Sequence, residues 1–228
     1  MSAACRGDSS TPEWVSTVYI PKHFNQSEIQ AIHDLMAGNP LGALVTAGSG
    51  GLCANHIPFE LVREVAPYGA LLGHVARANP VWRETSEESE ALVIFQGANA
   101  YVSPTWCPSK KVHGKVVPTW NYVVAHAYGF IRFIEEPSWL KSHVERLTTR
   151  EESAFDQPWS VDDAPAEFTA KMLTAVVGIE IVVTRLEGKW KVSQNRPIDD
   201  QHGVAEGLRN RGANGSEQMA AYIEGQEG

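Results

Sequence analysis

The pattern of hydrophobic positions changes near residue 41, from a helical period to short runs typical of strands. Before that point, Ser27–Gln30 has the spacing of a capping box, and Ile32 and Met36 continue a helical period toward a stop at Gly38. After it, apolar runs alternate with Gly, Pro and Asn, and strands are expected at 41–46, 52–61, 71–76, 92–95, 100–104, 116–124 and 127–133. Their close spacing favours an antiparallel sheet or barrel over βαβ units.

The last third of the chain mixes helices with further strands. Ser138 is the expected N-cap of a second helix, and a third helix is expected after Pro165. The remaining elements are expected as a strand at 179–184, a turn at Gly188 into a second strand at 189–193, and a short helix at 199–208. The sequence therefore predicts an α+β fold, a mainly β barrel with helical insertions toward the C-terminus.

The 228 residues fit one principal domain. Residues 1–18 are polar and without periodicity, so a disordered leader is expected there, followed by a domain over 19–210. The segment 211–228 is rich in Gly, Asn and Glu and is expected to be a flexible tail.

Composition limits the function classes. Lys and Arg number 19 and Asp and Glu 27, giving a net charge of −8, which argues against broad electrostatic binding to nucleic acid but not against a local anion pocket. Three cysteines without a CxxC indicate reduced thiols in the cytoplasm. No apolar stretch is long enough to span a membrane, and the histidines show no metal-ligand spacing. No catalytic residue can be assigned.

One segment has the composition of an anion site. The strand ending in His74 continues into Arg77 and Asn79, and Pro80 favours a turn there. Arg offers a rigid fork of donors suited to phosphate, with His and Asn beside it. The alternative is an arginine on the rim of the barrel.

Further polar and aromatic positions interrupt the predicted strands. Asn55 and His56 precede Pro58, which indicates an edge or a bulge where a flat ligand can reach free backbone groups. The other candidates are Tyr101 and Ser103 on one strand, Trp120 and Asn121 on another, and Lys191, Gln194 and Asn195 after the last strand. The aromatic rings could stack on a planar ring or fill a core or dimer interface, and the last three residues could be a solvated strand end.

Several segments together resemble the PaiB family of FMN-binding negative transcriptional regulators. The resemblance runs from about residue 19 to about residue 208. It is carried by YIPKHF (19–24), ANHIPFEL (54–61), GHVARANPVW (73–82), AYVSPTW (100–106), VPTWNYVVAHAYG (117–129), Leu147-Thr148, Gln157-Pro158-Trp159 and KVSQNR (191–196).

The resemblance implies a Greek-key, FMN-binding split β-barrel that forms a homodimer, with FMN in the groove between subunits. It implies a phosphate site at His74, Arg77 and Asn79, with Asn55 and His56 along the flavin. Tyr101, Ser103, Trp120 and Asn121 are implied contacts from the same or the facing subunit, and the family motif alone adds Lys191, Gln194 and Asn195.

One departure and three functions stay open. Family members tend to begin with Met before YIPKHF, so Val18 is hypothesised to be the natural start. The family implies DNA as a partner, which the net charge does not support. The alternatives are a flavin-dependent oxidoreductase of the pyridoxamine-phosphate-oxidase-like class and a haem-binding split barrel, with His56, His74 or His126 as axial ligand.

Overall fold

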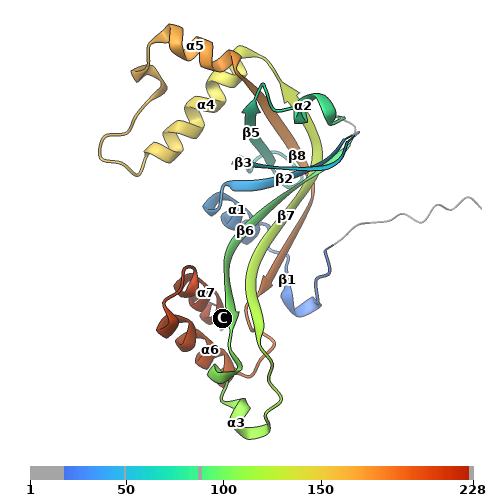
Figure 1. The fold of residues 1–228 in the computed structure, drawn as a ribbon, viewed down its shortest axis with the longest axis vertical. Coiled ribbons are helices and arrows are strands. Elements are labelled where there is room, and N and C mark those ends of the chain that lie inside the picture. Colours follow the sequence, from blue (N-terminus) through green and yellow to red (C-terminus); the bar gives the residue numbers. More distant parts are fainter. Residues whose placement is uncertain (1–17, 49, 87–88, 226–228) are drawn as a thin grey trace, which may run out of the picture.

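The computed structural model describes residues 18–48, 50–86 and 89–225, so residues 1–17 of the expected leader lie outside the described part. Its elements are ordered along three long strands that run most of the length of the molecule (Figure 1). Those strands are β6 (Glu90–Val102), β7 (Thr119–Ile134) and β8 (Val176–Lys191). Within the described residues, no helix is both long and apolar enough to cross a membrane.

The sheet is antiparallel throughout, in the order β3-β2-β6-β7-β8-β5-β4, with β1 added beside β8. The shorter strands are β1 (Asn25–Gln26), β2 (Leu41–Gly48), β3 (Gly51–Pro58), β4 (Glu60–Val62) and β5 (Ala70–Ala76). A Cβ on Gly73 of β5 would lie 3.0 Å from Ile57 of β3 and 3.1 Å from Phe59, so a glycine lets the two ends of the sheet approach closely. This arrangement confirms the predicted α+β split-barrel class.

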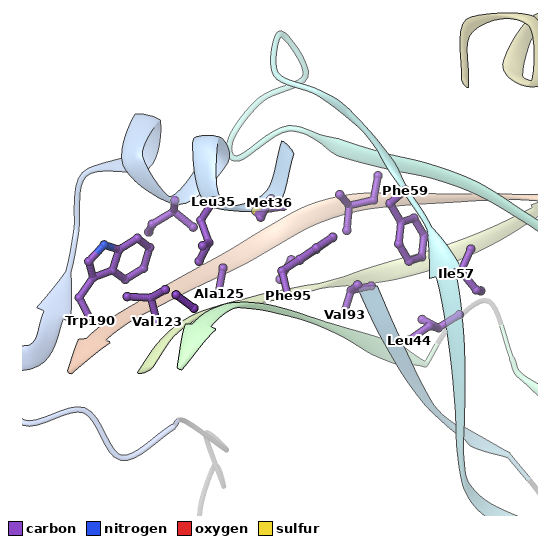
Figure 2. Close-up of a cluster of buried hydrophobic side chains, with 14 of the residues drawn as sticks. Leu35, Met36, Leu44, Ile57, Phe59, Val93, Phe95, Val123, Ala125 and Trp190 are labelled. Carbon is purple, nitrogen blue, oxygen red and sulfur yellow. The ribbon is translucent and has the colours of Figure 1, made fainter. Parts of the chain in front are cut away.

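The core lies between the sheet and α1 (Ile29–Gly38), whose Ile32, Leu35 and Met36 are buried. Figure 2 shows Leu35 and Met36 above the side chains of β6 and β7, including Phe95 and Val123. The predicted capping box does not form. Glu28, not Ser27, is the N-cap and makes no side-chain cap bond; its own N–H donates to the Gln26 side chain at 2.9 Å.

Several predicted strands are parts of longer ones. The run at 92–95 and residues 100–102 of the next run belong to β6, with a bulge between Gln96 and Asn99. The next two runs belong to β7 from Thr119 onward. The turn predicted at Gly188 is wrong, because β8 passes straight through it. A Cβ there would lie 2.8 Å from Ile32 and 2.9 Å from the Gln26 carbonyl oxygen, so this glycine provides room for α1 and β1.

A helical arm separates β7 from β8 and projects from the barrel (Figure 1). It consists of α4 (Pro137–Glu152), η3 (Val161–Asp163) and α5 (Ala166–Thr174). The N-cap of α4 is Glu136 rather than the predicted Ser138, because Pro137 occupies the first helical position. Trp139 anchors the arm, since a Cβ on Gly178 of β8 would lie only 2.3 Å from its ring.

The chain end is folded where a flexible tail was predicted. α6 (Ile198–Arg211) and α7 (Ser216–Glu224) pack against β6, and Leu208, Met219 and Ile223 are fully buried. Gly212 and Gly215 take left-handed φ values of 61° and 77°, which turn the chain between the two helices. The predicted tail is therefore wrong for residues 216–224.

The short elements are η1 (Lys22–Phe24), α2 (Val81–Glu84), η2 (Pro104–Trp106) and α3 (Ser109–His113).

Candidate functional site

The predicted site residues fall into two groups at opposite ends of the long strands. The edge group comprises Asn55, His56, His74, Arg77 and Asn79, near β3, β5 and α2. The aromatic group comprises Tyr101, Ser103, Trp120, Asn121, Lys191, Gln194 and Asn195, near the end of β6 and the start of β7. In Figure 1, α2 and β5 lie at one end of the molecule and α3, which follows β6, lies at the other. One chain therefore does not bring the two groups together.

An amide pair organises the edge group. Asn79 Nδ2 donates to Asn55 Oδ1 at 2.7 Å, and Asn79 Oδ1 accepts the Val81 N–H at 3.0 Å. The pair ties the turn after β5 to β3, which is an outer strand of the sheet, as Pro58 had predicted. His56 lies on the other face of β3 and is exposed.

Arg77 is engaged within its own chain. Its Nε donates to the Thr174 carbonyl at 2.8 Å, Nη2 donates to the Val176 carbonyl at 3.3 Å, and Nη1 forms an ion pair with Glu135. These contacts join the barrel to the base of the arm. A phosphate at Arg77 would share the guanidinium with Glu135.

His74 is the outer member of a chain of titratable groups that the sequence did not reveal. His74 Nδ1 lies 3.2 Å from Nε2 of His143 on α4, and His143 Nδ1 lies 3.5 Å from Glu60. His143 is fully buried and stacks on Trp139. Burial lowers the pKa of His74, while burial and the neighbouring His74 together lower the pKa of His143 to about 4. Both rings are accordingly neutral near pH 7.

In the aromatic group, two rings and one lysine lie together. Tyr101 and Trp120 are cross-strand partners with ring centroids 6.0 Å apart in an edge-to-face arrangement, and Trp120 is 56% exposed. Lys191 Nζ donates to the Thr119 hydroxyl and the Trp120 carbonyl. Burial, with Lys189 and Arg196 nearby, lowers the Lys191 pKa. Ser103 bonds the Thr105 hydroxyl at 2.7 Å.

The other members of this group mostly shape the backbone. Asn121 is buried and donates to the Ser193 hydroxyl at 2.9 Å, and Ser193 takes a left-handed φ of 67°. The Gln194 side chain accepts from the Val192 N–H and donates to the Trp190 carbonyl, while Asn195 is exposed. The polar density after β8 is therefore largely used to turn the chain toward α6.

The donor set suits a flat, hydrogen-bonding ring system. An exposed tryptophan beside a tyrosine offers a stacking surface, and the Asn55–Asn79 amides lie at an outer strand, β3, whose backbone can be approached. Such a set fits the isoalloxazine ring and polar chain of a flavin mononucleotide.

Comparison with known proteins first identifies the class of protein, which is one with an FMN-binding domain. The model of the family described as "Putative FMN-binding domain" matches residues 18–185. The Bacillus subtilis "Protease synthase and sporulation protein PAI 2" is 31% identical over 207 aligned residues, covering 91% of this chain and 97% of that protein. The chain therefore belongs to the PaiB family of FMN-binding proteins, and its cofactor is FMN.

Other similar proteins agree with this assignment. An uncharacterized protein of Emericella nidulans, AN0679, is 32% identical over 241 aligned residues, covering 90% of this chain and 96% of its own. Among solved structures, the "FAD and Heme binding protein" of Mycobacterium smegmatis superposes with a TM-score of 0.53 at 18% identity, covering 80% of each chain. At that identity the superposition shows a common fold.

Proposed function

We propose that the protein acts as a homodimeric, FMN-binding negative regulator of transcription. In this proposal, the edge group of one subunit and the aromatic group of its partner contact the same FMN. The observation that carries it is the separation of the two groups, since the residues proposed to contact FMN lie at opposite ends of a single chain.

The outer faces of β6 and β7 support the dimer. Along these strands, Val93, Phe95 and Val123 point into the core. Four of the alternate positions on the opposite face also carry large apolar or aromatic side chains and are half-buried, and Phe130 is 52% exposed. Strands that are apolar on both faces are typical of sheets covered on both sides. The half-buried outward residues are Leu92, Ile94, Tyr122 and Val124. A second copy of the chain is the proposed cover.

When bound, FMN supplies the redox chemistry of its isoalloxazine ring. The protein's part in this proposal is to bind and orient that ring: Trp120 and Tyr101 through their faces and edges, and Asn55 and Asn79 through their amides.

Mixed dimers test the shared site. Asn55→Ala and Trp120→Ala are each expected to weaken FMN binding. A heterodimer of the two variants should hold one FMN with wild-type affinity, because one groove carries both changes and the other carries neither. The matched control pairs the Asn55→Ala/Trp120→Ala double variant with wild type, which leaves one change in each groove and no intact site. Equal FMN retention by both heterodimers, measured by flavin absorbance after gel filtration, would refute the shared site.

The regulatory role has a separate support and a separate test. The name of the Bacillus relative connects that protein with protease synthesis and sporulation, and the relationship extends over most of both chains. A gel-shift titration of the FMN-loaded dimer against genomic fragments at low salt should retain a specific band. The net charge of −8 opposes binding to DNA, so a retained band would be strong support. If the protein retains none of the fragments even at low salt, direct repression is contradicted.

A second candidate function is a flavin-dependent oxidoreductase. The chain Glu60–His143–His74 favours it, because two neutral histidines in series can accept and pass a proton. Anaerobic reduction of the bound FMN by NADH or NADPH would support this function. A flavin that neither nucleotide reduces would argue against it.

A further inference from the structure

A hollow of about 260 Å³ lies beside the aromatic group, where α6 and α7 meet β6. The sheet contributes Asn99, Ala100, Tyr101 and Trp120, and the turn between the helices contributes Arg211, Ala213, Asn214 and Ser216. In Figure 1 the two helices lie against the end of β6. None of the helical residues was recognised in the sequence, because this segment was predicted to be a tail.

Ser216 gives the first indication of a ligand. The residue lines the hollow and is only 2% exposed, and its buried Oγ has no hydrogen-bond partner in the part of the chain that the structure describes. Buried hydroxyls are normally paired, because leaving one unpaired costs free energy. A ligand with an acceptor atom would satisfy it.

The start of α7 adds a positive field. Gly215 is the N-cap and provides no capping side chain, and the Ser216 N–H donates to the Ala213 carbonyl at 2.9 Å, so the next amides of the first turn, those of Glu217 and Gln218, carry the positive end of the helix. A Cβ on Gly215 would lie 3.4 Å from the Asn99 carbonyl oxygen, which places the helix start against the β6 bulge. The one carboxylate in this turn, Glu217, is bound by Arg209 Nε at 3.0 Å.

Arg211 adds a formal charge that folding does not use. Its neighbour on α6, Arg209, pairs with both Glu217 and Glu224. Arg211 has no ion pair or hydrogen-bond partner among residues 18–48, 50–86 and 89–225, although it lines the hollow. An unpaired guanidinium, an unpaired buried hydroxyl and a helix start on one hollow form a donor set for an anion.

We propose that this hollow binds a small aromatic anion, one ring bearing a single carboxylate or phosphate. The anionic group is held by Ser216 Oγ, Arg211 and the first turn of α7, and the ring lies against Tyr101 and Trp120. The volume limits the ligand, because pockets for larger organic molecules run from about 300 to 1,000 Å³. The hollow shares Tyr101 and Trp120 with the aromatic group that is proposed to contact FMN, so the ligand lies on the side of these rings that faces α6 and α7. Ser216 and Arg211, which hold the anionic group, belong to neither group of the proposed FMN site.

Phenyl phosphate, benzoate and inorganic phosphate are the probes, titrated calorimetrically into the full-length protein with and without FMN. Saturable binding of phenyl phosphate or benzoate is expected in both forms, tighter than that of inorganic phosphate. Arg211→Gln and Ser216→Ala should weaken it about tenfold and several-fold respectively, as expected for charged and neutral hydrogen bonds. Trp120→Leu should remove the advantage of phenyl phosphate over inorganic phosphate.

Arg132→Gln is the matched control, because it removes the same charge from an exposed arginine on β7 outside the hollow. It should leave the affinity unchanged. Equal weakening by Arg132→Gln and Arg211→Gln would reduce the effect to net charge and overturn the site. No saturable binding by any probe, or displacement of bound phenyl phosphate by FMN, would also overturn it.

Discussion

The two ends of the long strands carry similar polar side chains but use them differently. In the edge group, Arg77 is held by Glu135 and by two carbonyls, and Asn79 donates to Asn55. At the opposite end, Arg211 has no partner in the described chain, and the buried Ser216 hydroxyl is unpaired. At the first end, the Arg77 contacts join the barrel to the arm, and the asparagine pair joins the turn after β5 to β3. Unpaired donors at the second end are available to a ligand.

The comparison of the two ends requires α7 to be packed against the rest of the domain. A core substitution on α7 therefore has the largest expected effect on stability. Met219 is fully buried in the main core, so Met219→Ala should lower the free energy of unfolding by about 2–5 kcal/mol through lost contacts and a cavity. Urea denaturation followed by circular dichroism measures it. Met172→Ala on α5 is the control, since that side chain is 43% exposed and should cost much less. Equal small effects would mean that α7 is not docked.

The buried histidines of the edge group should make stability depend on pH. Burial lowers the pKa of His143 to about 4, whereas the unfolded chain takes up a proton near 6.5. Stability is therefore full above about pH 6.5 and falls as pH drops toward 4, by on the order of 3 kcal/mol. Burial also lowers the His74 pKa, which acts in the same direction, while Glu60 opposes the shift.

Urea denaturation at a series of pH values between 4 and 8 measures this loss. His143→Phe keeps a ring beside Trp139 and removes the titrating group, so the loss between pH 6.5 and 4 should shrink. His113→Gln, at an exposed histidine of α3, should leave the pH profile as in wild type. An unchanged profile in His143→Phe would show that other groups carry the acid sensitivity.

Substitution of Arg77 distinguishes two roles of its guanidinium, contacts within the chain that stabilise the fold and a contact with the FMN phosphate. In FMN-free protein, Arg77→Ala should lower the free energy of unfolding by about 1–2 kcal/mol, because the Thr174 and Val176 carbonyls and Glu135 lose their donor. A direct phosphate contact would in addition weaken FMN binding by about 1.5–3 kcal/mol.

Glu135→Gln is the companion variant, since it leaves Arg77 in place and removes the competing carboxylate. Thermal unfolding and an FMN titration of both variants give the two quantities. Unchanged stability in FMN-free Arg77→Ala would mean that the contacts with the arm contribute nothing.

Local signals in the sequence located elements better than their ends, since both predicted N-caps, Ser27 and Ser138, were wrong. Gly48, Gly50 and Gly51 are a composition typical of a hairpin turn, and Gly48 does pair with Gly51 across the hairpin of β2 and β3. Gly188 carries a similar local signal, but the packing of α1 and β1 against β8 decides its role, so the predicted turn was wrong.

The candidate site shows the same limit. The residue types of the edge group were identified, but their partners Glu135, Thr174 and His143 come from the distant arm. Ser216 and Arg211 gave no signal, because their setting depends on α7 docking against β6. Composition can suggest which side chains bind anions, whereas only the fold tells which of them are already paired.

The smallest expected effect on stability is that of removing the Arg211 charge. Arg211→Gln should change the free energy of unfolding by less than about 0.5 kcal/mol, because this guanidinium has no partner within the described residues. Arg209→Gln, two residues earlier on α6, breaks ion pairs with Glu217 and Glu224 and should lower the melting temperature more. Scanning calorimetry of both variants without ligand measures the difference. A large loss in Arg211→Gln would mean that folding itself uses this charge, whereas a negligible loss leaves it free to bind an anion.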